Sequence, residues 1–206
     1  VERGADGAVP LVAASVGPYG AYLADGSEYR GDYDVDEDAL TAFHAGRLAL
    51  LAEAKPDLLA CETLPCLVEA RAIVRALRQE DIHIHAWFSF SCRDVAHISD
   101  GTEITACARF LNDVPEAAAI GLNCTAPQYV EELIRAIRSE TAKPIVVYPN
   151  SGEHYDTSDQ SWHGAAEDFG RAAHRWRSAG ARLIGGCCRT TPREIAEIAA
   201  WAKSAE

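Results

Sequence analysis

The sequence predicts an α/β fold, a (β/α)₈ TIM barrel of which this chain carries about six βα units. Short apolar runs alternate with amphipathic helical segments along the whole chain. The apolar runs are apolar on both faces, which is typical of parallel strands in a covered sheet. Polar and reactive residues collect where these runs end, and a barrel builds its functional site at the carboxyl ends of its strands.

Six apolar runs are predicted to be strands. They cover residues Leu11–Ser15, Leu58–Glu62, His85–Phe90, Ala119–Cys124, Ile145–Tyr148 and Arg182–Gly186. No Gly-rich dinucleotide turn follows any of them, and this weakens the alternative of a doubly wound sheet. The barrel is therefore the better prediction.

Helices are predicted between these strands. Apolar residues recur at i, i+3, i+4 and i+7 in five segments that start at Ala70, Ile104, Val130, Phe169 and Ile195. Residues Asp36–Ala54 form a sixth predicted helix with a less regular stripe. Thr191, Pro192 and Glu194 resemble an N-cap, a first-turn proline and a capping-box partner.

The chain has 206 residues, whereas a barrel usually needs about 250 residues and eight strands. We expect one domain over residues 1–206 that lacks the first two strands of the barrel. The strands Leu11–Ser15 and Arg182–Gly186 would then each lack a neighbour. Exposed strand edges pair readily with other chains, so oligomers could form there.

Composition excludes several classes of function. Apolar residues make up 48 % of the chain, which is typical of a globular protein. Acidic residues outnumber basic ones by 31 to 19 without a basic cluster, so a nucleic-acid partner is not expected. No apolar run reaches the roughly 18 residues of a membrane helix. Seven cysteines without a secretory signal favour a reducing cytoplasm.

Three cysteines are candidate metal ligands. Cys124 ends one predicted strand, and Cys187 and Cys188 end the last. Three thiolates at one rim could hold zinc at about 2.3 Å from each sulfur, and three protein ligands with an open fourth position is the catalytic pattern. Gly185 and Gly186 would supply the backbone freedom that adjacent ligands need. Spacing alone leaves two alternatives open, namely buried core cysteines and a vicinal disulfide.

Other residues at strand ends are candidates for substrate binding. Glu62 ends an apolar strand, where a carboxylate is costly unless it is paired or faces the cavity. It could bind a substrate ammonium or form a salt bridge to an arginine. Ser15 and Gly17 begin a tight turn, and glycines there allow close approach of a ligand to the backbone. The remaining four cysteines are expected in the core.

These motifs resemble bacterial homocysteine S-methyltransferases, and the resemblance is closest to the branch that uses S-methylmethionine. It is carried by SVGPYGAYLADGSEYRGDY, LLACETLP, GLNC, YPNSGEHYD and LIGGCCRTTP, which begin at Ser15, Leu58, Gly121, Tyr148 and Leu183. Betaine–homocysteine methyltransferase and the homocysteine module of methionine synthase are more distantly similar. Family members open with a strand that ends in Asp-Gly, and the resemblance places that strand outside this chain.

The resemblance implies a zinc barrel with Cys124, Cys187 and Cys188 as ligands. It implies that Glu62 holds the amino group of L-homocysteine. It also places Asn150 where some relatives supply an oxygen to zinc in the absence of substrate. The methyl donor would be a sulfonium, S-methylmethionine or S-adenosylmethionine, and the product methionine.

Two other functions remain open. A metal-dependent hydrolase could use the same barrel, but it would need His and Asp ligands that activate water. A shortened paralogue could instead act as a metal-binding or interaction protein without activity.

Overall fold

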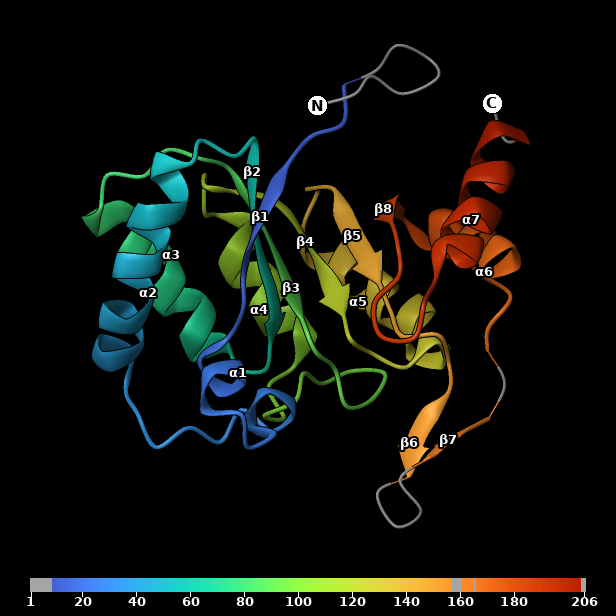
Figure 1. The fold of residues 1–206 in the computed structure, drawn as a ribbon, viewed down its shortest axis with the longest axis horizontal. Coiled ribbons are helices and arrows are strands. Elements are labelled where there is room, and N and C mark those ends of the chain that lie inside the picture. The colour runs from blue at the N-terminus through green and yellow to red at the C-terminus, as the bar shows by residue number, and fades with distance from the viewer. Residues whose placement is uncertain (1–8, 157–160, 165, 205–206) are drawn as a thin grey trace.

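A six-stranded parallel sheet organises the computed structural model, which describes residues 9–156, 161–164 and 166–204. The strand order is β1-β2-β3-β4-β5-β8. Their bounds are β1 Ala13–Val16, β2 Leu58–Leu64, β3 Ala86–Phe90, β4 Ala117–Asn123, β5 Ile145–Tyr148 and β8 Ala181–Ile184. All six carboxyl ends point to one edge of the sheet (Figure 1).

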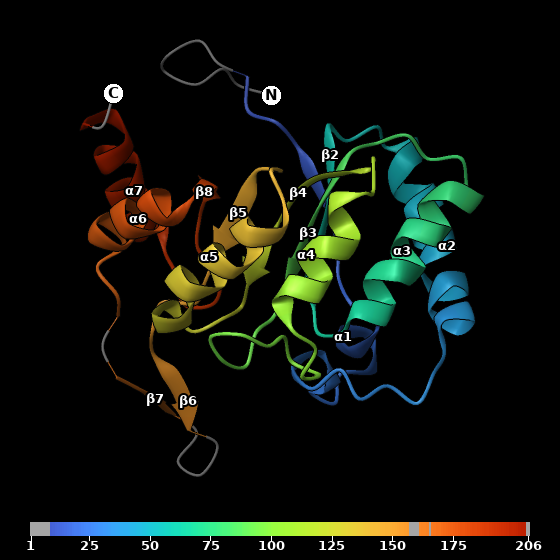
Figure 2. The same cartoon turned by 180° about the vertical axis from the view of Figure 1, so that it is seen from behind.

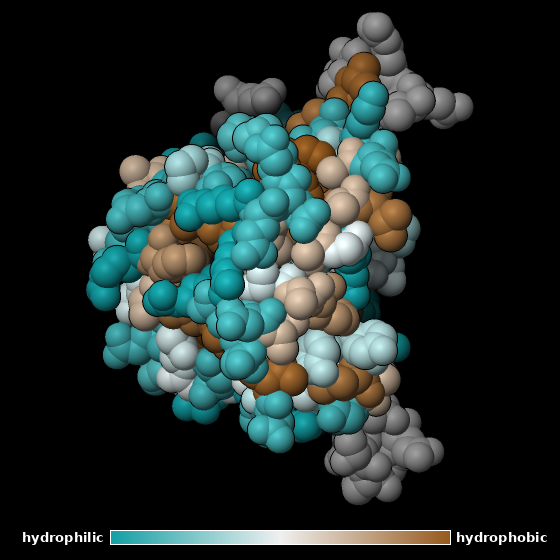
Figure 3. Space-filling view, turned by 90° about the vertical axis from the view of Figure 1, so that its left-hand side faces the viewer, coloured by the Kyte–Doolittle hydropathy of each residue, from teal (hydrophilic) through white to brown (hydrophobic). Residues whose placement is uncertain are grey.

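Helices cover the outer face of this curved sheet, as they do in a (β/α)₈ barrel. They are α2 Glu37–Glu53, α3 Leu67–Gln79, α4 Ile104–Asn112, α5 Val130–Glu140, α6 Phe169–Ala179 and α7 Pro192–Ser204. Figure 2 shows them in front of the strands when the molecule is seen from behind. The outer side of α2 and α3 is largely hydrophilic (Figure 3). The core lies between the helices and the sheet, where Phe88, Ile120 and Val147 are fully buried.

Short elements gather at the carboxyl ends of the strands. They are α1 Tyr19–Leu23, the 3₁₀ turns η1 Ser27–Tyr29 and η2 Pro127–Tyr129, and the hairpin of β6 His154–Asp156 and β7 Ser161–His163. The sequence did not predict these elements, because each is too short to show a periodic pattern. The six predicted strands and the six predicted helices are all present, with ends shifted by a few residues. The last strand ends at Ile184, two residues before the predicted Gly186.

The two ends of the sheet are open within the described residues. There β1 pairs only with β2, and β8 pairs only with β5. Leu11, just before β1, is 70 % exposed, and Leu183 in β8 is 40 % exposed. Oligomer formation at these edges remains a prediction. In the described part of the chain, none of the helices combines the length and apolar character needed to cross a membrane.

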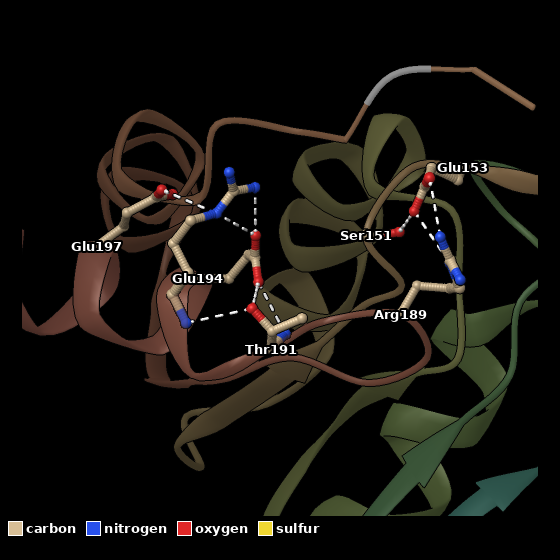
Figure 4. Close-up of polar contacts among 7 residues, drawn as sticks. Ser151, Glu153, Arg189, Thr191, Glu194 and Glu197 are labelled. Carbon is tan, nitrogen blue, oxygen red and sulfur yellow. Dashed lines mark hydrogen bonds and ion pairs between the residues drawn. The ribbon is translucent and has the colours of Figure 1, made fainter.

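The predicted capping box at the start of α7 is confirmed (Figure 4). The Thr191 hydroxyl oxygen accepts from the backbone N–H of Arg193 at 3.2 Å, and Glu194 Oε2 accepts from the backbone N–H of Thr191 at 2.7 Å. Hydrogen bonds from Thr191, followed by Arg193, lower the pKa of Glu194 to about 2. The box therefore fixes the start of α7 just after the cysteine pair.

We predict that Glu194→Gln lowers the stability of the protein at neutral pH. An unfolded glutamate has a pKa of about 4.3, so the carboxylate stabilises the fold fully above that pH. This contribution is lost as the pH falls toward the folded pKa of about 2. Urea midpoints at pH 7, 5 and 3.5 should show a gap between variant and wild type that shrinks at the lowest pH. Glu197→Gln, one turn further on, is the control, and a gap independent of pH would contradict the assignment.

Candidate metal centre and substrate site

Cys124, Cys187 and Cys188 converge at the carboxyl edge of the sheet. Cys124 Sγ lies 2.8 Å from Cys187 Sγ and 3.8 Å from Cys188 Sγ, and the two adjacent cysteines have their sulfurs 4.0 Å apart. A tetrahedral zinc with bonds of about 2.3 Å separates its sulfurs by about 3.8 Å. The two sulfur pairs that include Cys188 match this spacing, and the sulfurs of Cys124 and Cys187 would have to move apart by about 1 Å. These residues thus fit a zinc ion, and all three are free thiols rather than disulfides.

This centre, defined as Cys124, Cys187 and Cys188, is the single group of three potential metal-ligating side chains found among the described residues. No histidine or carboxylate joins it there. The other four cysteines, Cys61, Cys66, Cys92 and Cys107, are buried. Burial raises the pKa of each of these four thiols. They therefore belong to the core, as the sequence predicted.

Two residues with left-handed backbone conformation lie in the cysteine loops. Cys124 has a φ of 48° and Arg189, which follows the cysteine pair, has a φ of 66°. Such values are uncommon for residues other than glycine and concentrate at functional sites. Arg189 is anchored by Glu153, whose carboxylate accepts from its Nε at 3.1 Å and its Nη2 at 3.2 Å (Figure 4).

Gly186 plays a different part from the one expected. The sequence suggested that Gly185 and Gly186 would supply unusual backbone angles, but neither has a positive φ. A Cβ on Gly186 would instead lie 2.5 Å from Thr190 Oγ1. The requirement there is for space, because the chain folds back tightly after the cysteines.

The three thiols form one cluster linked by hydrogen bonds. Hydrogen bonds from Cys124 and then Cys187 lower the pKa of Cys188 to about 3. The hydrogen bonds of Cys124 with Cys187 and Cys188, and then its burial, raise the pKa of Cys124. Because the three sulfurs lie this close together, ionisation of all three is unfavourable unless a cation offsets the added charge.

Glu62 is held by two hydrogen bonds near the carboxyl end of β2. Its Oε1 accepts from Ser15 Oγ at 2.6 Å, and its Oε2 accepts from Tyr148 Oη at 2.9 Å. No arginine or lysine pairs with Glu62 among the described residues, so the salt-bridge alternative finds no support there. Ser15 is thus brought to Glu62, although its role toward a substrate remains a prediction. Burial, followed by the Glu62 charge, raises the pKa of Tyr148.

Gly17 and Asn150 lie on separate loops. A Cβ added to Gly17 would meet nothing within 4 Å, so the turn does not need a glycine there. Gly20 is the tight position, because a Cβ would lie 2.4 Å from the backbone nitrogen of Glu28. Asn150 follows β5, and its buried Oδ1 has no hydrogen-bond partner. An unpaired buried oxygen is costly, so this atom is available to a ligand.

Sequence reasoning assigned no role to five further residues that interact with the cysteines, with Glu62 or with Asn123: Tyr29, Thr63, Ser89, Asn123 and Tyr148. Tyr29 lies close enough to the cysteines that their charges, after burial, raise its pKa to about 12. Tyr148 Oη is also bonded by Trp87 Nε1 at 2.9 Å. Asn123 directly precedes Cys124 within the GLNC motif, which was the one signal available in the sequence.

Comparison with known proteins identifies close relatives. The family model described as homocysteine S-methyltransferase matches residues 1–202. Homocysteine S-methyltransferase YbgG of Bacillus subtilis is 56 % identical over 197 residues, which are 95 % of this chain and 62 % of the relative. Homocysteine S-methyltransferase of Escherichia coli is 49 % identical over 193 residues, 92 % of this chain and 62 % of the relative.

The solved structures give the same result. The homocysteine methyltransferase MmuM from Escherichia coli in its metallated form superposes with a TM-score of 0.82 at 44 % identity, covering 97 % of this chain and 62 % of that one. Its oxidised form gives 0.81 at 46 % identity, with 95 % and 62 % covered. The chain thus spans about 62 % of the length of these relatives.

We predict that single Cys→Ala changes at Cys124, Cys187 or Cys188 each abolish stoichiometric zinc binding. Two thiolates leave the ion without a stable donor set, since the loss of a ligand cannot be made up by a neighbour in the described site. Zinc content after dialysis, measured by atomic emission, is the readout. Cys107→Ala, in the core, is the control and should keep the metal. Full zinc occupancy in Cys188→Ala would sink the assignment.

Proposed function

The chain belongs to the homocysteine S-methyltransferase family, and from this premise we propose that the protein transfers a methyl group from a sulfonium donor to the thiol of L-homocysteine, forming methionine. The observation that carries the proposal is the convergence of three sulfurs within 4.0 Å of one another beside a hydrogen-bonded carboxylate. A methyl transfer to a thiol needs a thiolate and a fixed substrate, and this site offers groups for both.

We assign zinc to the centre of Cys124, Cys187 and Cys188. An all-thiolate donor set favours zinc over harder divalent ions. A zinc ion bound there supplies the charge that keeps the homocysteine thiol deprotonated, whereas a free thiol with a pKa of about 8.5 is mostly protonated at neutral pH. The seven free cysteines suit a reducing compartment such as the cytoplasm.

Glu62 would bind the substrate ammonium. Ser15 and Tyr148 hold its two oxygens by hydrogen bonds, so the carboxylate is oriented before the substrate enters. A charge-assisted bond to an ammonium is then formed without further ordering of Glu62. Gly17, two residues beyond Ser15, leaves open space at the same loop for the substrate.

Asn150 would supply a polar contact between the two cysteine loops. Its backbone N–H donates to Thr125 O at 3.0 Å, next to Cys124. Its neighbours Pro149 and Ser151 are bonded to Cys187 and Cys188. The backbone of residues 149–151 thus contacts both cysteine loops, and the unpaired Oδ1 would be available to the metal or to the substrate.

The donor would approach as a cation. The substrate sulfur forms a bond to the methyl carbon while the donor carbon–sulfur bond breaks, and the donor leaves as a neutral thioether with that electron pair. The proton of homocysteine is released to solvent, so no general base is needed at the methyl. The charges of the cysteines contribute to the raised pKa of Tyr29, so this ring lies within their field, and an aromatic face attracts cations of this kind.

The activity is tested by supplying L-homocysteine with S-methylmethionine or S-adenosylmethionine to the zinc-loaded protein and measuring methionine. We expect methionine with at least one donor. A protein that binds zinc and homocysteine but forms no methionine from either sulfonium would point to the metal-binding or interaction role instead.

We predict that Glu62→Gln raises the KM for homocysteine by about tenfold to a hundredfold, because a charged hydrogen bond contributes about 1.5–3 kcal/mol. Zinc content should not change, since Glu62 is absent from the cysteine centre. The same change at Glu132 on the outer side of α5 is the control. An unchanged KM in the Glu62 variant, with activity retained, would exclude the role.

A further inference from the structure

Two side-chain hydrogen bonds join strands that are not neighbours in the sheet. The backbone N–H of Thr63 donates to Asn123 Oδ1 at 2.7 Å, and Asn123 Nδ2 donates to Thr63 Oγ1 at 2.7 Å. Thr63 is on β2 and Asn123 on β4, and β3 lies between them. From β3, Ser89 Oγ donates to Asn123 Oδ1 at 2.9 Å. Asn123 is 1 % exposed, so its amide acts inside the fold.

Thr63 has an unfavourable backbone conformation, and its hydrogen bonds with Asn123 help to hold it there. Its φ is 60°, and a β-branched residue in the left-handed region is a true outlier. The register of β2 against β3 also shifts between Cys61 and Leu64, as at a bulge. Bulges near functional sites re-aim side chains. Here the bulged pair is Glu62–Thr63, so the turn at Thr63 helps to set the direction of the Glu62 carboxylate.

The same threonine reaches the cysteine centre. Thr63 Oγ1 donates toward Cys124 Sγ at 3.9 Å, a hydrogen bond to sulfur. Cys124 is the residue after Asn123 and is itself left-handed, with a φ of 48°. The Asn123 amide therefore links two functional candidates through Thr63. Glu62 directly precedes Thr63 in the chain, and Cys124 directly follows Asn123.

We propose that Asn123 is a positioning residue that couples Glu62, the carboxylate that would bind the substrate ammonium, to the metal centre. Through the backbone of Thr63 it fixes Glu62, and through the hydroxyl of Thr63 it places a hydrogen bond on the Cys124 sulfur. The inference rests on the proposed function, because it takes Glu62 as the ammonium site and Cys124 as a ligand. Neighbours of this kind tune the charge and orientation of a ligand without touching the metal.

The two routes can be separated with four variants. Asn123→Ala removes both routes. Thr63→Gly removes the hydroxyl but adopts the left-handed conformation without steric strain. The double variant Asn123→Ala/Thr63→Gly lacks the hydroxyl and the amide but keeps that backbone accessible. Asn112→Ala is the matched control, because Asn112 is an exposed asparagine on the outer helix α4.

Two readouts are measured on each protein: zinc affinity by competition with a chelator, and the KM for homocysteine at saturating zinc. In Asn123→Ala we expect zinc affinity to fall and the KM to rise, each by about tenfold or more. Thr63→Gly should lose zinc affinity with a KM within about twofold of wild type. In the double variant the KM should return most of the way to the wild-type value, while zinc affinity stays low. Asn112→Ala should change neither.

Several results would overturn the proposal. Wild-type zinc affinity together with a wild-type KM in Asn123→Ala would do so. A double variant whose KM is no lower than that of Asn123→Ala would do so as well. If Asn123→Ala does not fold, Thr63→Ser and Thr63→Gly still decide the hydroxyl route. The serine variant should keep wild-type zinc affinity and the glycine variant should lose it, and equal affinities would refute the route.

Failure of the proposed function gives a different pattern. A wild-type protein that binds zinc but forms no methionine overturns the methyl transfer. The zinc affinities of the variants do not depend on turnover, so they test the link between Asn123 and Cys124 in that case as well.

Discussion

The cysteine centre depends on the segment after β5, residues 149–151, which binds the backbone of both cysteine loops. Strand β5 lies between β4 and β8, so Cys124 and the pair Cys187–Cys188 come from strands that do not touch. Cys187 N donates to the carbonyl before Asn150 at 2.8 Å, and Asn150 N donates to the carbonyl after Cys124 at 3.0 Å. Left-handed residues in both loops cost about 1–3 kcal/mol each. Backbone bonds of about 0.5–1.5 kcal/mol apiece help to offset that cost.

The sequence predicted those features that follow from periodicity and topology. Strand ends in a parallel sheet share one edge, so Cys124 and Cys187 could be placed together without knowing any contact. The contacts of Asn123 could not be found in this way. They join residues 60 positions apart and depend on a bulge in β2, for which the sequence has no signal. The same holds for Tyr148, whose bond to Glu62 spans 86 positions.

A buried pair that the sequence did not suggest fixes the segment between β1, which carries Ser15, and α1. Glu69 and His44 are both fully buried, and their side chains lie 2.8 Å apart, Glu69 Oε1 to His44 Nε2. The same oxygen accepts from the backbone N–H of Tyr19 at 2.5 Å. This places the start of α1 against α2 and α3. Apolar replacements of such a pair can be as stable, so its value lies in specifying one arrangement of the loop.

The donor set of the site supports the proposed methyl transfer over the hydrolysis that the barrel also left open. A hydrolase needs a bound water and a base beside it, and the described residues place no histidine with the three cysteines. Glu62 has both oxygens occupied by hydroxyl donors, which suits an acceptor for an ammonium better than a base. Three cysteinates carry −3, so a divalent ion among them leaves the centre at −1 by formal charge. A thiolate substrate added there would keep much of its electron density, and this supports the proposed attack on a positively charged methyl donor.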